Sequence, residues 1–216
     1  MLVRERMSRH PITVRPDTSL YDALRLMREE HVRRLPVLDK ASKLVGIVLE
    51  KDLLYASPSP ATSLSVYEMN YLTAKVKVSE LMTRNVITVD ENTPLEEAAR
   101  IMADNSIGGL PVMRDSQLVG MITESDLFKI FLELLGARTW GLRVTVKMGD
   151  GKGILARLTT DLAAHDGYIV ALGTFWGDDP TNRELTFKVQ GISPEKMKTI
   201  VENWDAELVD MREVQI

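Results

Sequence analysis

The stretch GMITESDL at residues 120–127 has a counterpart earlier in the chain, GIVLEKDL at residues 46–53. Both stretches carry a glycine, a short apolar run and an Asp-Leu pair, but Thr123 stands where the earlier stretch has Leu49. A short apolar run that leads into an acidic segment is typical of a strand followed by a helix. The two stretches therefore predict that one strand–helix unit occurs twice, with a difference at the residue before the helix.

The similarity continues upstream of both stretches at a constant spacing, because Met82 follows Met7 by 75 residues. The residues that recur at this spacing are Met7, Arg9, Ile12, Thr13, Val14, Thr18, Leu20, Ala23, Arg25, Met27, Leu35, Pro36 and Val37. After the Pro-Val step one residue is lost, so that Gly46 corresponds to Gly120 and Asp52 to Asp126. Repetition at a fixed spacing indicates two copies of one supersecondary unit.

Each copy is predicted to have the order β-α-β-β-α. A β-branched run predicts the first strand, and apolar residues at helical spacing predict a helix with Thr18 or Thr93 as its N-cap. Two strands joined by a tight turn follow, and a second helix is expected to begin near Glu50 and near Glu124. The first strands are 12–14 and 86–89, the helical runs 20–27 and 95–102, and the hairpin strands 34–39 with 43–49 and 109–113 with 117–123.

A connector rich in proline and serine, ASPSPATS at 56–63, separates the two copies and cannot continue a helix. The residues that follow it predict a helical turn or two and then an extended KVKV at 75–78. The expected domains are residues 1–56 for the first copy, 57–79 for the connector with its short helix, and 80–135 for the second copy.

The pattern changes near residue 138, where no third copy begins. GLRVTVKM alternates as a strand does, GILARLTTDLAAHDG is typical of a helix, and YIVALGTFW and RELTFKVQG predict two strands around a turn. A Ser-Pro start predicts a second helix over SPEKMKTIVENW, and ELVDMREV predicts a last strand. The order β-α-β-β-α-β over 138–216 is the ferredoxin-like plan, so the expected fold class of the chain is α+β.

The composition is that of an ordinary globular protein, with 216 residues, 44% hydrophobic and 27% charged. There are no cysteines, which excludes disulfides, thiolate zinc sites and cysteine nucleophiles. A net charge of -4 provides no general attraction to nucleic acid. Because no stretch has the length of a membrane span or of a signal-peptide core, the expected location is the cytoplasm.

The segment from Thr123 to Asp126 has two interpretations. A threonine before a helix with an acid three residues later is a capping arrangement that needs no ligand. A helix N-terminus also attracts anions, and a carboxylate there can accept hydrogen bonds from two ribose hydroxyls. Both uses can coexist in one segment.

Arg33 and Arg34 stand before LPV in the first copy, where the second copy has Gly108 and Gly109. An exposed basic pair is the ordinary interpretation, and phosphate binding by the planar guanidinium is the alternative. The three histidines lack metal-ligand spacing, and no nucleophile elbow, Walker loop or catalytic carboxylate pair is present, so the chain is expected not to be an enzyme.

These residues resemble a known family. A β-α-β-β-α unit with LPV in its middle and GMITESDL at its end is similar to the CBS domain, and two such units in tandem resemble a Bateman module over about residues 1–135. The tail, with VTVKMGDGKGILARL, resembles an ACT domain. The order CBS–CBS–ACT is similar to that of the bacterial acetoin-utilisation proteins.

The resemblance implies regulatory binding of an adenosyl ligand (AMP, ADP, ATP or S-adenosylmethionine) at positions that each combine residues of both copies. The main position would comprise Thr123, Ser125, Asp126, Ser8, Thr13, Val32, Arg33 and Arg34. A second position would comprise Leu49, Asp52, Thr83, Thr88, Ile107 and Gly108. Since Leu49 is a poor cap and cannot bond a ribose, and since the second copy lacks the arginines, the second position is expected to be weak, empty or altered.

The ACT resemblance implies that Asp150, Gly153 and Ile154 belong to a loop that holds an amino acid at a dimer interface, although Ile169 replaces the usual Asn after the helix. The alternative function is therefore an amino-acid sensor with the CBS pair as scaffold. Beyond these regulatory ligands, no cofactor or metal is expected. The expected partners are a second copy of the chain and an unidentified downstream protein, with no nucleic acid and no membrane.

Overall fold

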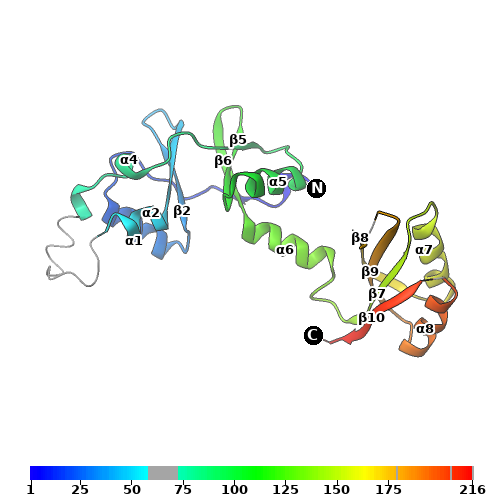
Figure 1. The fold of residues 1–216 in the computed structure, drawn as a ribbon. Helices are drawn as coiled ribbons and strands as arrows, with labels where there is room; N and C mark the ends of the chain where they lie inside the picture. Colours follow the sequence, from blue (N-terminus) through cyan, green and yellow to red (C-terminus); the bar gives the residue numbers. More distant parts are fainter. Residues whose placement is uncertain (58–72, 179, 205, 216) are drawn as a thin grey trace. The chain divides into compact units, whose positions relative to one another are not determined.

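Figure 1 shows a computed structural model of the chain, which describes residues 1–57, 73–178, 180–204 and 206–215. The chain divides into two compact units, Met1–Leu127 and Phe128–Ile216, and each is considered by itself. The predicted α+β fold is confirmed, with two β-α-β-β-α repeats followed by a β-α-β-β-α-β unit. Most of the predicted connector, residues 58–72, lies outside the described residues.

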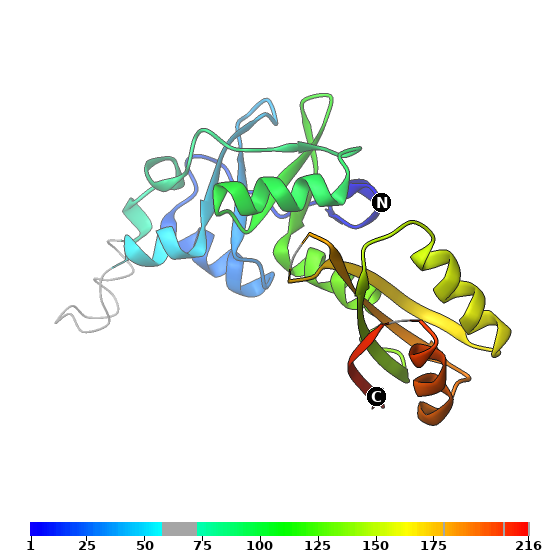
Figure 2. The ribbon, with the colours of Figure 1, turned by 45° about the vertical axis from the view of Figure 1, so that its right-hand side comes forward.

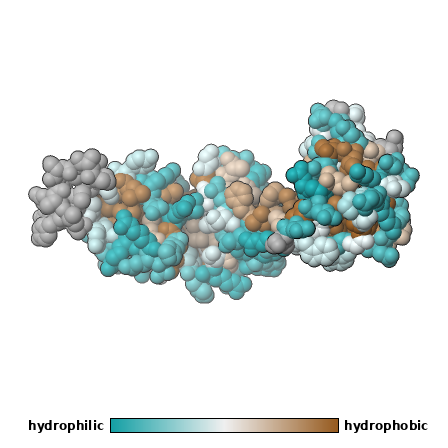
Figure 3. Space-filling model, turned by 90° about the horizontal axis from the view of Figure 1, so that it is seen from below, coloured by the Kyte–Doolittle hydropathy of each residue, from teal (hydrophilic) through white to brown (hydrophobic). Residues whose placement is uncertain are grey.

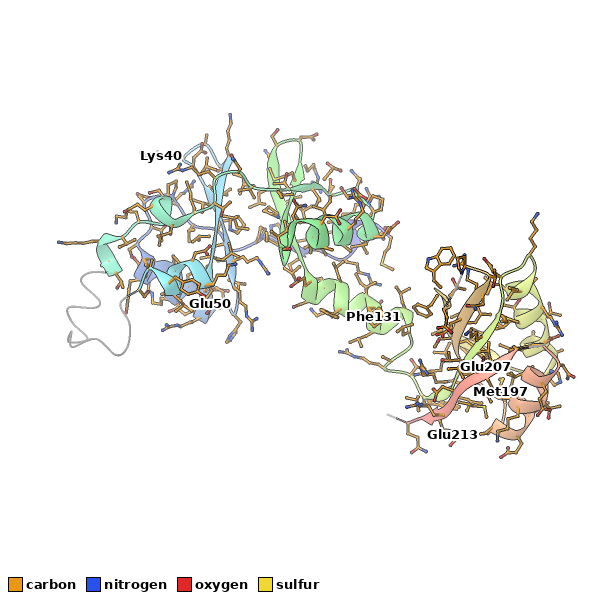
Figure 4. All side chains as sticks on the ribbon, viewed as in Figure 1. Lys40, Glu50, Phe131, Met197, Glu207 and Glu213 are labelled. Atoms are coloured by element: carbon orange, nitrogen blue, oxygen red, sulfur yellow. The ribbon has the colours of Figure 1, made fainter. Side chains whose placement is uncertain are left out.

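The two repeats contain the predicted helices and hairpin strands, whereas the strand predicted at 12–14 is reduced to a bridge at Val14. In the first repeat the elements are η1 (Val3–Glu5), β1 (Ser8–Arg9), α1 (Leu20–Glu29), β2 (Arg34–Leu38), β3 (Leu44–Leu49) and α2 (Glu50–Tyr55). In the second they are α4 (Val78–Leu81), β4 (Val89–Asp90), α5 (Leu95–Asn105), β5 (Gly109–Arg114), β6 (Gln117–Thr123) and α6 (Glu124–Leu134). Glu50, labelled in Figure 4, begins the second helix of its repeat as expected.

Each repeat contributes its first residues to the sheet of the other repeat. β1 pairs antiparallel with β6, so that Ser8 lies opposite Met121. In the same way Thr83, which corresponds to Ser8, pairs with Ile47 of β3 through two backbone hydrogen bonds of 3.0 and 2.9 Å. The two sequence copies therefore do not form two separate globules, because each completes the sheet of the other.

The turns that precede these strands are exchanged as well. The Val3 amide donates to the Thr93 carbonyl and the Val78 amide donates to the Thr18 carbonyl, both at 2.9 Å. The blue N-terminal end accordingly lies beside the green helix α5 in Figures 1 and 2. Val78 and Met82, from the start of the second copy, are part of the buried core of the first repeat.

The glycine shared by the two opening stretches is explained by this exchange. A Cβ at Gly120 would lie 2.5 Å from the Met7 Sδ and 2.9 Å from the Ser8 carbonyl oxygen, and a Cβ at Gly46 would lie 2.5 Å from the Met82 Sδ. Real Cβ atoms do not approach neighbours this closely. Only glycine therefore lets the exchanged segment cross each sheet without a shift.

Three details of the sequence prediction were wrong. The run KVKV at 75–78 is not extended throughout, because Val78 begins α4. The expected strands at 12–14 and 86–89 are shorter, because only Val14 bridges Val37 and only Val89 enters β4. The expected cap Thr18 instead accepts a hydrogen bond from the Arg15 amide, and the neighbouring Ser19 caps α1.

The expected cap Thr93 is also displaced by one residue, since the N-cap of α5 is Pro94, which has no capping side chain. The Thr93 amide donates to the Asp90 carbonyl and therefore belongs to the preceding turn. In both repeats the threonine closes the turn before the helix rather than the helix itself.

The second unit has the strand order β10-β7-β9-β8, which is the ferredoxin-like arrangement, and all neighbouring strands are antiparallel. Its elements are β7 (Gly141–Gly149), α7 (Ile154–Ala164), β8 (Tyr168–Trp176), β9 (Asn182–Gln190), α8 (Pro194–Glu202) and β10 (Glu207–Val214). α7 and α8 pack against the sheet over a core that includes Phe187 and Met197, the latter labelled in Figure 4. The predicted Ser-Pro start is confirmed, since the Ser193 side chain caps α8.

The segment that follows α6 is held on this sheet by a buried lysine. Lys188 of β9 is 3% exposed, and its Nζ donates to the carbonyls of Gly136 (2.7 Å) and Thr139 (3.0 Å). Burial lowers the pKa of Lys188, and the nearby Arg143 adds to the shift. Gln190 donates to the Trp140 carbonyl at 2.7 Å. The segment 136–140 is therefore fastened to β9 by side chains that satisfy its carbonyl groups.

Replacing Gly120 by alanine is expected to destabilise the first unit by about 1–3 kcal/mol, because the added methyl overlaps the exchanged segment. Urea unfolding followed by far-UV circular dichroism measures this. The three tryptophans, Trp140, Trp176 and Trp204, all belong to the second unit, so their fluorescence reports on that unit separately. Gly151→Ala is the control, since nothing lies within 4 Å of a Cβ there. An unchanged unfolding midpoint for Gly120→Ala would contradict the exchange.

Replacing Lys188 by methionine is expected to release the segment 136–140, because two carbonyls lose their donor while the hydrocarbon stem is kept. Arg138 is exposed in this segment, so trypsin should cleave after it faster in the variant than in the wild type. Mass spectrometry of the first tryptic fragments measures the rate. Lys147→Met, on a neighbouring strand, is the matched control, and equal cleavage in both variants would count against the role of Lys188.

Candidate functional site

The first unit contains a cavity of about 540 Å³ that is formed by residues of both repeats. It is lined by Arg34, Ile47, Leu49, Lys51, Asp52, Thr83, Asn85, Val86, Ile87, Ser106, Ile107, Gly108, Gly109, Pro111 and Glu124. The start of α2 contributes from the first repeat and the start of β5 from the second. Thr83 reaches the cavity because its segment crosses to β3. A cavity of this volume is of the size that small-molecule ligands occupy.

The structure brings together most of the second set of predicted ligand residues. Leu49, Asp52, Thr83, Ile107 and Gly108 all line the cavity, whereas Thr88 is exposed and is not among the lining residues. Lys51, Asn85 and Glu124 also line it and were not singled out in the sequence. The signal that could have indicated them is their place in the chain, since Lys51 adjoins Asp52, Glu124 adjoins Thr123, and Asn85 follows Thr83 by two residues.

Arg34 lines this same cavity, although the family resemblance placed it in the other set. It begins β2 opposite Leu49, and its guanidinium lies over Gly108, where a Cβ would overlap the Nη2. A Cβ at Gly109 would lie 3.3 Å from the Nη1. The expectation that the second set has no arginine beside it is therefore wrong, because the two glycines make room for Arg34.

Arg34 is half-buried, and its surroundings change its ionisation. Burial lowers the pKa of Arg34, the negative charge of Glu124 opposes this, and the positive charge of Arg33 adds to it. A guanidinium remains charged under such conditions. The cavity therefore holds a cation that has lost part of its hydration.

In the other set, Thr123 and Asp126 form the predicted capping arrangement at the start of α6. The Asp126 carboxylate accepts hydrogen bonds from the Thr123 hydroxyl at 2.7 Å and from the Thr123 amide at 3.0 Å. Ser125 is exposed beside them. The capping interpretation of this segment is correct, and Asp126 has a structural role with or without a ligand.

The remaining residues of this set lie on segments around the end of β6. Ser8 belongs to β1, which pairs with β6 upstream of Thr123. Thr13 and Val32 are half-buried, whereas Arg33 is exposed and its carbonyl accepts a hydrogen bond from the Glu50 amide at 3.0 Å. The structure thus places the strand of Ser8 beside the strand that ends at Thr123.

The glycine-rich loop of the second unit lines a separate cavity of about 510 Å³, which includes Asp150, Gly153, Ile154 and Arg183. The Asp150 carboxylate forms an ion pair with the Arg183 Nε at 3.3 Å, and the Arg183 guanidinium lies 3.5 Å above the Trp176 ring. Gly153 has a φ of +87° and precedes α7, a conformation that favours glycine. The three predicted loop residues are therefore adjacent, next to an arginine from β9.

Two features are absent from the residues that the structure describes, a metal-binding cluster and a membrane-crossing helix. Within those residues, no group of three or more His, Cys, Asp or Glu side chains could hold a metal ion. The same residues contain no helix that is both long enough and apolar enough to cross a membrane.

Two repeats that exchange their first residues and enclose a cavity between them define a paired repeat module. The sequence model of the CBS domain matches this chain at residues 3–59 and 78–133, which are the two repeats. The chain belongs to the CBS domain family.

Individual relatives agree with this assignment. A CBS domain-containing protein of Dictyostelium discoideum is 35% identical over 136 residues, which are 62% of this chain and 94% of the relative. An L-aspartate semialdehyde sulfurtransferase of Methanocaldococcus jannaschii is 31% identical over 131 residues, which are 60% of this chain but 23% of the enzyme. The similarity to that enzyme thus covers a small part of its length.

Two solved structures share the fold. The CBS domain pair of protein MJ0100, in complex with 5'-methylthioadenosine and S-adenosylmethionine, has a TM-score of 0.52 at 30% identity and covers 64% of this chain and 98% of its own. A protein of Vibrio cholerae assigned to acetoin utilization (AcuB) has a TM-score of 0.52 at 35% identity, with 64% and 95% covered. Both support the predicted resemblance to CBS pairs.

Proposed function

We propose that this chain is a non-enzymatic regulatory protein that binds an adenosyl ligand, such as AMP, ADP, ATP or S-adenosylmethionine, in its CBS pair. The observation that carries the proposal is the cavity lined by Asp52, Thr83, Ile107 and Gly108 from both repeats. A related CBS pair, that of MJ0100, is known with adenosyl ligands bound. A ligand held by two repeats at once can change how the repeats are held together, which is what a sensor requires.

The residues of the cavity suit an adenosyl group. The Asp52 carboxylate at the start of α2 can accept hydrogen bonds from both ribose hydroxyls, and Thr83 and Asn85 offer further polar groups. Ile47, Ile107 and Pro111 provide apolar contact for a base. We assign the other ligand position, which the family resemblance made the main one, to Thr123, Ser125 and Asp126 with Ser8, Thr13, Val32 and Arg33, related to the first by the repeat.

The wider setting of the protein is also part of the proposal. The likeness to the Vibrio cholerae protein favours a link to acetoin utilisation. We further propose that the chain acts in the cytoplasm on a downstream protein partner. A homodimer is proposed because β8 is an edge strand of its sheet and carries exposed aromatic residues, Tyr168 at 69% and Trp176 at 70%. Hydrophobic residues are visible on the surface of this unit in Figure 3. Exposed apolar side chains on a strand edge favour pairing with another chain.

Isothermal titration calorimetry with AMP, ADP, ATP and S-adenosylmethionine tests the main proposal. Saturable binding of at least one ligand is expected. Asp52→Ala or Asp126→Ala should weaken it by at least about tenfold, since a hydrogen bond to a charged group is lost. Asp17→Ala, an exposed carboxylate outside both ligand sets, is the control.

Circular dichroism confirms that each variant is folded, which matters for Asp126 because it also caps α6. No saturable binding of any of the four ligands would refute the proposal. Binding that neither aspartate variant alters would refute the assigned positions. Two equal sites per chain would contradict the expected difference between the two positions.

A second candidate function is amino-acid sensing by the second unit. It is favoured by the cavity beside Asp150, Gly153 and Ile154, where Arg183 offers a guanidinium to an α-carboxylate. The first turn of α7 adds amides that have no partner within the helix. In this case the CBS pair would be a scaffold.

A thermal-shift screen with the twenty standard amino acids tests this candidate, with tryptophan fluorescence as the signal of the second unit. A stabilising amino acid is expected to lose its effect in Arg183→Met, because the carboxylate partner is removed. Lys196→Met, on the helix side of the unit, serves as the control. The absence of a shift with every amino acid would exclude this function.

A further inference from the structure

A hollow with polar walls lies between the two helices of the second unit. α7 and α8 are on the same face of the sheet (Figure 1), and the space between them measures about 310 Å³, at the lower end of the range of small-molecule sites. The hollow is lined by Arg157, Asp161, His165, Lys196, Thr199, Ile200 and Asn203. These residues belong neither to the cavity beside Asp150 nor to the CBS pair.

The spacing of the lining residues shows that each helix turns a polar face to the other. The three that come from α7 and its C-cap are four residues apart, and the three polar ones from α8 and its C-cap are three and then four apart. These intervals place side chains on one face of a helix. The apolar faces of both helices, with Leu158 and Met197, belong to the core over the sheet.

The carboxylate of Asp161 and the guanidinium of Arg157 are fixed by contacts within the unit. The indole of Trp204, a residue that is 2% exposed, donates to the Asp161 carboxylate at 2.6 Å. Arg157 donates from its Nη2 to the Asn203 carbonyl, and its Nε lies 3.9 Å from the same carboxylate. Because a guanidinium has five N–H donors, Arg157 keeps donors for a ligand.

His165 is held so that one ring nitrogen is left for a ligand. Its Nδ1 lies 2.8 Å from the Asp161 carbonyl oxygen. Since a carbonyl oxygen only accepts, Nδ1 carries the hydrogen of this bond, and Nε2 remains. When the imidazole is protonated, Nε2 also carries a hydrogen and can donate it to an anion.

Lys196 lies in the first turn of α8, where the helix dipole disfavours a cation. The neighbouring Glu195 does not compensate for this. Hydrogen bonds from its own backbone amide and from the Ser193 side chain lower the pKa of Glu195 and hold its carboxylate at the helix start. Among the residues that the structure describes, Lys196 has no ion-pair partner. The ammonium is therefore available to an anion from outside the chain.

The lining residues carry an excess of positive charge. Arg157 and Lys196 are cations, Asp161 is the one carboxylate among the residues that line the hollow, and His165 adds a charge when it is protonated. Asp161 is already bonded to an indole. Donors that approach from two helices suit a tetrahedral oxyanion, whose oxygens accept hydrogen bonds in several directions.

We infer that this hollow binds the phosphate group of a small molecule, with Arg157, His165 and Lys196 as its donors. A phosphate monoester carries up to two negative charges and three strong acceptor oxygens, which matches these donors in number and sign. The second unit thereby recognises a ligand class different from that of the CBS pair. The inference does not depend on the proposed function, because no residue of the CBS pair takes part.

NMR titration of the ¹⁵N-labelled chain with glycerol 3-phosphate and with inorganic phosphate tests the site through the tryptophan indole signals. Of the three, the Trp204 signal is the one that Trp140→Phe and Trp176→Phe both retain. It should shift saturably with phosphate, because this indole is bonded to Asp161 at the site, and should not shift with chloride at equal ionic strength. Tighter binding of glycerol 3-phosphate identifies an ester as the ligand, and equal affinities identify the free anion.

Three variants separate this site from general charge effects. Lys196→Met should weaken phosphate binding at least about tenfold, because a charged donor is lost. Lys198→Met removes the same charge from α8 at an exposed residue outside the lining, and should change the affinity by less than about threefold. Arg183→Met removes the cation of the other cavity of this unit and should likewise change it by less than about threefold. Circular dichroism verifies the fold of each variant.

Three results would overturn the inference. The first is a Trp204 signal that phosphate moves no more than chloride does. The second is equal weakening by Lys196→Met and Lys198→Met, which would assign the effect to the overall charge of α8. The third is binding of succinate, a dicarboxylate, as tightly as glycerol 3-phosphate, since phosphate would then not be the group that is recognised.

Discussion

The exchange of strand segments between the two repeats is the constraint on which the first unit depends. Ser8 pairs with β6 of the second repeat, and Thr83 pairs with β3 of the first. Because each sheet is completed by the other copy, neither repeat can satisfy its backbone groups alone. The same crossing brings Thr83 of one copy to the residues around Leu49 of the other, so the cavity exists only where both copies meet.

Much of the fold could be predicted because its signals are local. The strands and helices of the second unit follow from alternation and from the Ser193 cap, both of which involve neighbours in the chain. The short strands near Val14 and Val89 were overestimated, since their β-branched residues pair with the sheet at one or two positions only. The N-caps of α1 and α5 lie one residue later than predicted. The reason is that the Thr18 hydroxyl and the Thr93 amide form hydrogen bonds within the preceding turn.

The segments that form the ligand site could be predicted, but the position of its charged side chains could not. The family resemblance indicated Asp52, Thr83 and Ile107, and these residues line one cavity. It did not indicate that Arg34 would lie over the glycines of the other repeat. A long side chain that extends from one repeat to the other leaves no pattern in the sequence. Arg34 and Lys188 are both cations with reduced hydration, and the carbonyls of Gly136 and Thr139 satisfy Lys188.

The exchange of segments also determines the order in which the first unit can fold during synthesis. Residues 1–9 leave the ribosome before the rest of the unit, but their partners in β6 lie more than one hundred residues later in the chain. The first sheet likewise lacks its edge until Thr83 has been made. Contacts of such long sequence separation form late and slow folding. The unit is therefore expected to fold as a whole after translation of both copies, which exposes the nascent first repeat to chaperones for that interval.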